Sequence, residues 1–322
     1  MKKGIIISIT MLGVLIIAAG VSLCIGSAEI SPSAVLSILA GGNQGTPDYM
    51  IITGLRLPRI ILAIIVGAML GISGAALQSL FRNSLVDPFI TGISSGAALG
   101  ASIGIISGFT FIIAPAFAGA MLAVFFVYTV SIKDGRVNSS RLLLTGVMTG
   151  TMLSSAVMLL SAVNSRDIVK VIYWLMGDLS GSNYQQIKGA AIILLAALAA
   201  GMFFANDLNI MSAGEETAST LGVNPEFLKL FYFILASIIT AAAVSLSGVI
   251  GFIGLVVPHA VRKFTGPDLR FLLPASAVFG ALFLLVCDTL ARTIFLPGEL
   301  PVGVITGLIG APIFIILAKR VK

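Results

Sequence analysis

The feature that most constrains this chain is a succession of long apolar segments, separated by short segments that carry most of the charged residues. The hydrocarbon core of a bilayer is about 30 Å thick, and a helix needs about 20 residues to cross it. Backbone amides find no water there, so runs of this length indicate membrane-spanning helices. A membrane barrel would instead show alternating segments of about ten residues. The sequence therefore predicts an all-α integral membrane protein.

The composition agrees with this class, because 58% of the 322 residues are hydrophobic and only 10% are charged. We predict about ten transmembrane helices in one domain that covers residues 1–322. The predicted spans are 4–26, 60–80, 90–110, 112–131, 142–163, 187–205, 227–246, 249–262, 271–291 and 301–318. The net charge of +6 would suggest nucleic acid for a soluble protein. In a membrane protein it reflects basic residues retained in the cytoplasm, so the partner is lipid and not nucleic acid.

The basic residues predict the orientation. Ten spans place both termini on one side, and cytoplasmic termini leave 13 of the 19 lysines and arginines in the cytoplasm, as the positive-inside rule requires. The cytoplasmic set is Lys2, Lys3, Arg82, Lys133, Arg136, Arg141, Lys229, Arg262, Lys263, Arg270, Lys319, Arg320 and Lys322. The external set is Arg56, Arg59, Arg166, Lys170, Lys188 and Arg292.

Residues 206–226 form the longest segment that has helix punctuation at both ends and no spanning character. Ser212 and Glu215 have the spacing of a capping box, which predicts a helix start. Gly222 suits the left-handed position that ends a helix, and the Asn-Pro pair at 224–225 predicts the start of the next one. A cytoplasmic elbow this short has no core of its own. It is either a plain connector or a surface that another protein grips.

Three other segments carry specific expectations. One span has a glycine every four residues, which predicts close helix packing in preference to a pore lining: Gly92, Gly96, Gly100, Gly104 and Gly108. Outside the membrane, 27–59 is predicted to hold a short helix opened by Ser31 and Pro32, then a Gly-rich loop and, after it, R-L-P-R at 56–59. The external segment 164–186 contains the only tryptophan, Trp174, which suits a helix at the membrane interface.

The sequence offers little material for catalysis, and we predict neither cofactor nor metal site. Its single histidine, His259, is more typical of local hydrogen bonding, and Cys24 and Cys287 lack metal or redox spacing. No nucleotide-binding loop is present. Asp288 is the main ionisable residue within a span, and pairing with Arg292 one turn later explains it. An ion-coupled carrier needs more intramembrane acids, and a membrane enzyme needs clustered polar residues. If the chain is a transporter, its energy is therefore expected from another subunit.

Eight motifs in order give the chain a resemblance to the FecCD family, the permease subunits of ABC importers for ferric siderophores, haem and cobalamin. They are R-L-P-R at 56–59, G-A-x-L-x-x-S-G-A-A-L-Q at 67–78, N-S-L-V-D-P at 83–88, S-R-L-L-L-T-G at 140–146, W-L-M-G-D-L-S-G at 174–181, G-E-E-T-A-S-T-L-G at 214–222, G-F-I-G-L-V-V-P-H at 251–259 and E-L-P-V-G at 299–303. The resemblance implies a ten-span permease with cytoplasmic termini in a prokaryotic plasma (inner) membrane. It also implies four partners: a second permease copy, identical or paralogous, two cytoplasmic ABC ATPases and an extracytoplasmic substrate-binding protein.

The resemblance also assigns roles to particular residues. The ATPase-coupling set is Gly214, Glu215, Glu216, Leu221 and Gly222. The set that docks the binding protein is Arg56, Arg59 and Arg292, for which ion pairing within the permease is the alternative. The cytoplasmic gate is Asn83, Leu85, Ser139 and Ser140, where V-N-S-S-R departs from the family pattern. The implied cargo is a metal chelate moved by alternating access, first of all a ferric siderophore. Cobalamin, haem and oxyanions such as molybdate are the alternatives.

Overall fold

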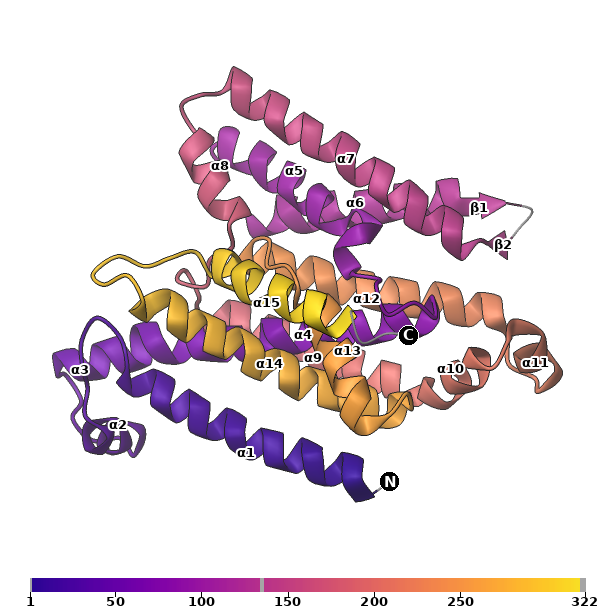
Figure 1. The fold of residues 1–322 in the computed structure, drawn as a ribbon. Helices are drawn as coiled ribbons and strands as arrows, with labels where there is room; N and C mark the ends of the chain where they lie inside the picture. The colour runs from indigo at the N-terminus through magenta and orange to yellow at the C-terminus, as the bar shows by residue number, and fades with distance from the viewer. Residues whose placement is uncertain (1, 134–135, 319–322) are drawn as a thin grey trace.

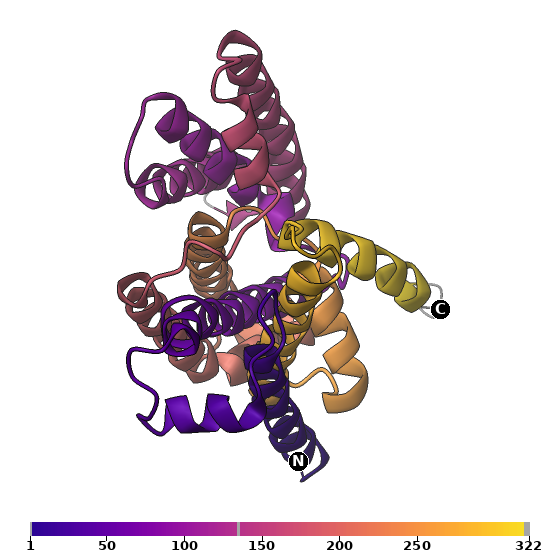
Figure 2. The same ribbon diagram turned by 90° about the vertical axis from the view of Figure 1, so that its left-hand side faces the viewer.

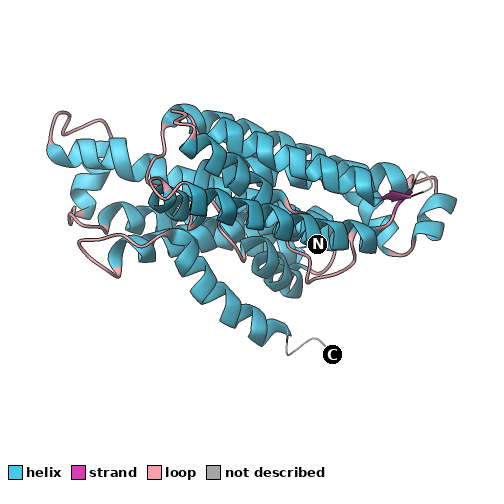
Figure 3. Cartoon of the chain, turned by 90° about the horizontal axis from the view of Figure 1, so that it is seen from above, coloured by secondary structure: helices cyan, strands magenta, loops and turns pink. Residues whose placement is uncertain are grey.

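The computed structural model describes residues 2–133 and 136–318. Long helices run roughly along one axis, so that loops and short helices gather at two opposite ends (Figure 1, Figure 3). The long helices are α1 (Lys2–Cys24), α4 (Leu57–Leu80), α5 (Ile93–Ile106), α6 (Ile113–Ser131), α7 (Ser139–Val163), α9 (Tyr184–Phe203), α12 (Pro225–Ser247), α13 (Ile253–Thr265), α14 (Leu269–Thr293) and α15 (Val302–Ala318). Each overlaps one predicted span, which confirms the all-α, multi-span fold.

Six helical segments of the described chain are long and apolar enough to cross a membrane, and parts of α1, α5 and α15 form shorter apolar helices. The first of the six runs without a break over Pro47–Leu80. It joins α3 (Pro47–Met50), a π-helix η1 (Ile51–Arg56) and α4. The R-L-P-R motif is therefore helical and leads into α4. Pro58 lies inside this continuous helix and has no N–H to donate to the preceding turn, where the Thr53 carbonyl oxygen accepts the Tyr184 hydroxyl at 2.8 Å.

Helix α4 lies at the centre of the molecule and is buried along most of its length. It packs against α14, α12, α13 and α9. Its contact with α14 brings two backbones together, because a Cβ added at Gly67 would collide with the carbonyl oxygen of Gly280. Close approach of this kind is how small residues hold membrane helices together. The buried hydroxyl of Ser73 contacts Thr240 Oγ1 of α12 at 2.6 Å, so α4 is fixed from more than one side.

Helices α5, α6, α7 and α8 (Ile168–Leu175) form a second group beside the α4 group (Figure 1, Figure 2). The predicted glycine packing is confirmed for its central positions, since a Cβ at Gly96 or Gly100 would meet the backbone of α6. The outer two glycines have another use. Gly92 and Gly108 adopt φ values of 83° and 74° at helix ends, a conformation that glycine reaches without strain.

The remaining elements lie at the two ends of the bundle (Figure 1). One end carries α2 (Pro32–Leu39) and the α14–α15 loop. The other carries α10 (Ala205–Ser212), α11 (Glu215–Thr220) and one short strand pair, β1 (Ile132–Lys133) with β2 (Arg136–Val137). Helix α1 begins and α15 ends toward this second end. Residues 319–322, which hold three of the predicted cytoplasmic charges, lie outside the described residues.

The predicted surface helix at 27–59 is confirmed as α2. Its first turn is capped by Ser31, whose Oγ accepts the backbone N–H of Ala34 at 3.3 Å. Proline follows the cap at the first helical position, as the sequence indicated. The external segment around Trp174 also contains a helix, α8, and Trp174 packs against buried residues of α5. Both short helices therefore form where their caps and aromatic residues predicted them.

Candidate functional site

The elbow between α9 and α12 contains two short helices, and the first turn of α11 differs from expectation. Ser212 ends α10, where its hydroxyl donates to the Asn209 carbonyl oxygen at 2.6 Å. The N-cap of α11 is Gly214, with φ 142°. The Ser212–Glu215 capping box was therefore wrong. Glycine lets the chain turn between the helices without a side-chain cap, and the Glu215 carboxylate contacts Lys229 instead.

The end of α11 and the start of α12 match the sequence pattern. Gly222 has φ 82°, and its N–H donates to Ser219 at 3.1 Å. The next N–H, of Val223, donates to Ala218 at 2.9 Å, which completes a Schellman motif. Asn224 then caps α12 by accepting the Phe227 N–H at 3.2 Å. These bonds satisfy free backbone groups at the end of α11 and at the start of α12. The elbow therefore has a defined backbone although it has no core.

Helix α11 presents most of the predicted coupling residues to the surroundings. Only Ala218 is buried among its six residues, and it is fully covered. Glu216 is exposed, and Leu221 is 65% exposed although it is a large apolar side chain. The Glu216 carboxylate and the Leu221 side chain thus lie on the surface of the elbow, where another protein can contact both. Gly214 and Gly222 serve the backbone turns at either end of the helix.

An ionic network ties α11 to the rest of this end of the molecule. The Lys229 ammonium lies 2.8 Å from Glu215 Oε2 and 2.9 Å from Glu226 Oε1. Glu226 Oε2 accepts the backbone N–H of Val137 in β2 at 3.1 Å. The lysine side chain is only 10% exposed, whereas the two carboxylates are 49% and 36% exposed. One largely covered cation therefore connects the elbow helix, the start of α12 and the short strand pair.

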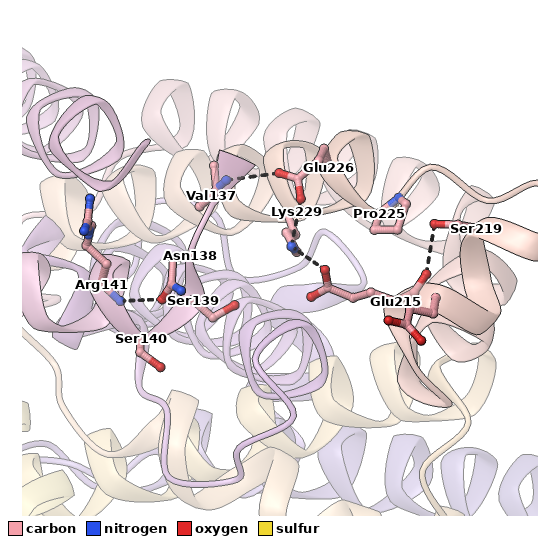
Figure 4. Close-up of a pocket in the computed structure, with 11 residues that line it drawn as sticks. Val137, Asn138, Ser139, Ser140, Arg141, Glu215, Ser219, Pro225, Glu226 and Lys229 are labelled. Atoms are coloured by element: carbon pink, nitrogen blue, oxygen red, sulfur yellow. Dashed lines mark hydrogen bonds and ion pairs between the residues drawn. The ribbon is translucent and has the colours of Figure 1, made fainter. Parts of the chain in front are cut away.

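A cavity of about 1160 Å³ separates this network from the start of α7 (Figure 4). Asn138 caps α7 by accepting the Arg141 N–H at 3.1 Å. Ser139 and Ser140 follow the cap and face the same cavity as the elbow carboxylates. The lining is Val137, Asn138, Ser139, Ser140, Arg141, Glu215, Glu216, Ser219, Pro225, Glu226 and Lys229. The fold thus brings two of the predicted gate residues to the predicted coupling residues.

The other two predicted gate residues belong to the loop after α4. Asn83 Oδ1 accepts the Leu85 N–H at 2.9 Å, and the Leu85 side chain is 53% exposed. Neither residue is among those that line the cavity. The loop is nevertheless fastened to the elbow, because the Arg82 guanidinium donates to the Met211 carbonyl oxygen of α10. Nearby, Asp87 caps the 3-10 helix η2 (Pro88–Thr91), and burial raises the pKa of its carboxyl to about 6.

The opposite end of the molecule holds a second ionic network, centred on a fully buried carboxylate. Asp288 Oδ1 accepts a hydrogen bond from Arg59 Nε at 2.9 Å, and Asp288 Oδ2 lies 3.2 Å from Arg292 Nε. Arg59 also contacts Glu299 Oε2 at 2.6 Å, and this carboxylate is 47% exposed. The predicted Asp288–Arg292 pair is therefore confirmed, and Arg59 joins it from α4. Both arginines are buried, as a carboxylate in an apolar region requires.

Arg56 differs from the other two arginines because backbone carbonyls hold it. Its guanidinium donates to Leu23 O at 2.6 Å and to the Ala28 carbonyl oxygen. Arg56, Arg59, Arg292 and Glu299 line one cavity of about 250 Å³ at this end. The three arginines predicted to dock a binding protein are therefore gathered in one place. The docking role itself stays a prediction, since each of them already has partners within the chain.

Sequence reasoning missed two residues of these networks, Lys229 and Glu299. The Glu226–Lys229 spacing of three is a recognisable helical pair. Neither the 14-residue separation of Lys229 from Glu215 nor the 240-residue separation of Arg59 from Glu299 has a periodic signal. In the described part of the chain, no three His, Cys, Asp or Glu residues are grouped so that they could hold a metal ion.

The chain is similar to known permease proteins of import systems. A model of the FecCD transport family matches residues 14–320. The chain is 44% identical to the cobalamin import system permease protein BtuC of Halobacterium salinarum, over 89% of this chain and 79% of that one. It is 40% identical to the hemin transport system permease protein HmuU of Yersinia pestis, over 96% and 95%. A solved chain described as a metal-chelate type ABC transporter in an inward-facing conformation superposes with a TM-score of 0.86 at 31% identity, covering 98% and 99%.

Proposed function

Because this chain belongs to the FecCD transport family, we propose that it is the membrane-spanning permease subunit of an ABC importer that moves a metal chelate by alternating access. It is a multi-pass protein of the plasma membrane. In the proposed complex, separate cytoplasmic ATPases supply the energy, and the end that carries α10 and α11 faces the cytoplasm. An extracytoplasmic binding protein delivers the substrate to the arginine end.

The observation that carries this proposal is the geometry of the elbow. Its backbone is fixed by the Schellman motif and the Asn224 cap, yet Glu216 and Leu221 stay exposed. A rigid helix with an exposed apolar and an exposed acidic side chain suits insertion into a groove of another protein. The elbow leads directly into α12, so displacement of α11 is transmitted to a spanning helix. An unattached connector needs none of these features.

The double variant Glu216→Arg with Leu221→Asp tests the coupling role. It reverses the charge and removes the apolar contact without touching a buried residue. We expect the tagged variant to insert normally and to lose most of the P-loop ATPase that co-purifies in mild detergent, together with ATP-driven uptake. Ser212→Ala, an exposed change in the same elbow, is the matched control. A double variant that retains the ATPase and transports normally contradicts the proposal.

Docking of the binding protein is proposed for the arginine end. Two features support it. The three arginines line one cavity, and the Glu299 carboxylate, which is paired with Arg59, is half exposed. An acidic side chain of a partner can therefore replace Glu299 without reaching into the buried Asp288 pair. Charged contacts of this kind speed association and weaken with salt.

Arg56→Gln is the sharpest test of docking, because Arg56 donates to backbone carbonyls and its loss leaves Asp288 paired with Arg59 and Arg292. Losing one charge-assisted pair predicts about tenfold weaker affinity for the binding protein at low salt, with a smaller difference at high salt. Lys188→Gln, an exposed change at the start of α9, is the control. Equal affinity of wild type and Arg56→Gln at low salt would count against docking here.

The pathway is proposed to lie between two copies of the chain. Helix α7 supports this, because exposed hydroxyl and methionine side chains, including Thr151, Ser155 and Met152, extend along it. The cargo class is a metal chelate, and relatives are named for cobalamin and hemin. Uptake by the reconstituted complex with a ferric siderophore, cobalamin and haem in parallel identifies the cargo. Transport by the chain without an ATPase would instead indicate an ion-coupled carrier.

A further inference from the structure

The network around Lys229 has a second property that the coupling residues alone do not explain. It reaches from α11 across α12 to the segment that starts α7. The last contact is made by a backbone N–H, that of Val137, and Val137 directly precedes the cap of α7. Movement of Glu226 therefore acts on the backbone next to Ser139 and Ser140.

The network is also the main polar connection of α11 to the rest of the fold. Within the described chain, α11 contacts α10 and the start of α12, and buries only Ala218. Among the residues that the structure describes, Lys229 is the one cation within ion-pair distance of the Glu215 carboxylate. The lysine is itself 10% exposed, so water does not readily take the place of its two carboxylate partners. A displaced α11 must then either pull Lys229 with it or break a largely covered ion pair, which is costly.

On this basis we infer that Lys229 and Glu226 form a relay that transmits displacement of the elbow helix to the α7 gate segment. Glu215 moves with α11 and pairs with Lys229. Lys229 pairs in turn with Glu226, whose second oxygen accepts the Val137 N–H. The inference rests on the proposed function, because it takes α11 as the ATPase contact and 139–140 as part of the gate. Lys229 and Glu226 are positioning residues in this relay and do not touch the substrate.

The cavity at this site gives the relay room to move. Glu215, Glu226 and Lys229 lie on one side of the 1160 Å³ space and Ser139 and Ser140 on the other (Figure 4). Direct packing between α11 and α7 would transmit movement without any ion pair. Here the bonds of Glu226 to Lys229 and to the Val137 N–H connect α12 to the segment before α7 along the cavity wall, beside the packing of α12 on β2.

Lys229→Met in the complete importer complex tests the relay, since methionine keeps the apolar stem and removes the ammonium. We expect the ATPase to co-purify as with wild type, while uptake per ATP hydrolysed falls about tenfold, within the usual range of coupling energies. Hydrogen exchange supplies a direct readout. In wild type, ATP should change exchange in both 205–224 and 132–141, whereas in the variant only 205–224 should respond. Lys229→Arg should restore coupling.

Two further variants separate a relay from a general loss of folding. Glu226→Ala cuts the bond to Val137 but leaves the Lys229–Glu215 pair, and it should reproduce the defect. Lys170→Met removes an exposed pair with Asp167 of the same i,i+3 geometry at the other end, and it should have no effect. Normal uptake, or an ATP response that persists in 132–141 of Lys229→Met, overturns the relay. Loss of the ATPase from Lys229→Met also overturns it, because Lys229 then acts in docking. A wild-type chain without any ATPase refutes the proposed function itself.

Discussion

The two ends of this molecule each hold an ionic network, and the two networks differ in burial. At the arginine end the shared group is an anion, Asp288, which is completely buried between two arginines. At the elbow end the shared group is a cation, Lys229, and its carboxylate partners are 49% and 36% exposed. A buried charge is costly to strip of its partners, whereas a half-exposed carboxylate keeps access to water when its own partner is removed. The comparison indicates that the network around Asp288 is rigid and that the network around Lys229 can rearrange.

The strongest test of this difference is Asp288→Asn. The change leaves Arg59 and Arg292 buried around a neutral amide, and breaking a buried pair in this way costs about 3–5 kcal/mol. We expect a large loss of thermal stability in detergent, measured as the temperature at which the chain leaves the monodisperse peak in size-exclusion chromatography. A variant as stable as wild type would show that the network is not rigid.

The second test applies the same measurement to Lys229→Met at the elbow. Because both carboxylates keep access to water, the expected loss is about 1 kcal/mol, well below that for Asp288→Asn. Equal losses at the two ends would remove the distinction drawn here. Lys170→Met, which breaks a pair whose lysine is 72% exposed, sets the lower reference.

A third test acts on the half-exposed member of the arginine network. Glu299→Gln frees Arg59 from one of its two carboxylates while Asp288 keeps both arginines. If an acidic side chain of the binding protein replaces Glu299, its removal should raise the affinity by about threefold to fivefold at low salt, which corresponds to under 1 kcal/mol. Lower affinity would mean that Glu299 contacts the partner itself.

The smallest effect is expected at Asp268, in the connection between α13 and α14. Its carboxylate binds Arg270 and Asn209, and the contacts with the Arg270 guanidinium lower its pKa from 3.8 to about 2. A lowered pKa adds stability above pH 3.8, and this stability is lost as the pH falls toward 2. For an exposed pair we expect under about 1 kcal/mol. Thermal stability of Asp268→Asn should therefore depend less on pH between 5 and 2 than that of wild type.

Much of the fold could be predicted from the sequence because lipid imposes a simple rule on spanning segments. Predicted and observed spans overlap throughout, and Gly222, the Asn-Pro pair at 224–225 and Asp288–Arg292 were found from local spacing. The capping box failed because two local solutions competed. Gly214 could turn the chain unaided, and Lys229 then bound the Glu215 carboxylate that the box required.

What could not be predicted depends on contacts between distant segments. Periodicity places Arg59 and Asp288 near the ends of their own helices but does not show that α4 and α14 lie side by side. The cavity between the elbow and α7 is likewise a product of the tertiary arrangement. For the same reason the roles of Asn83, Leu85, Ser139 and Ser140 stay predictions, although the fold places the two serines beside the elbow.

The pairing of Arg59 with Asp288 also has a consequence for how the chain is made. The two residues are separated by 229 positions. At a synthesis rate of about 5–20 residues per second, Arg59 enters the membrane roughly 10–45 s before its carboxylate exists. During that interval the guanidinium must reach water at the membrane surface, which its place at the end of a span allows. Final closure of the central helix pair is therefore a late event, completed only when α14 arrives from the ribosome.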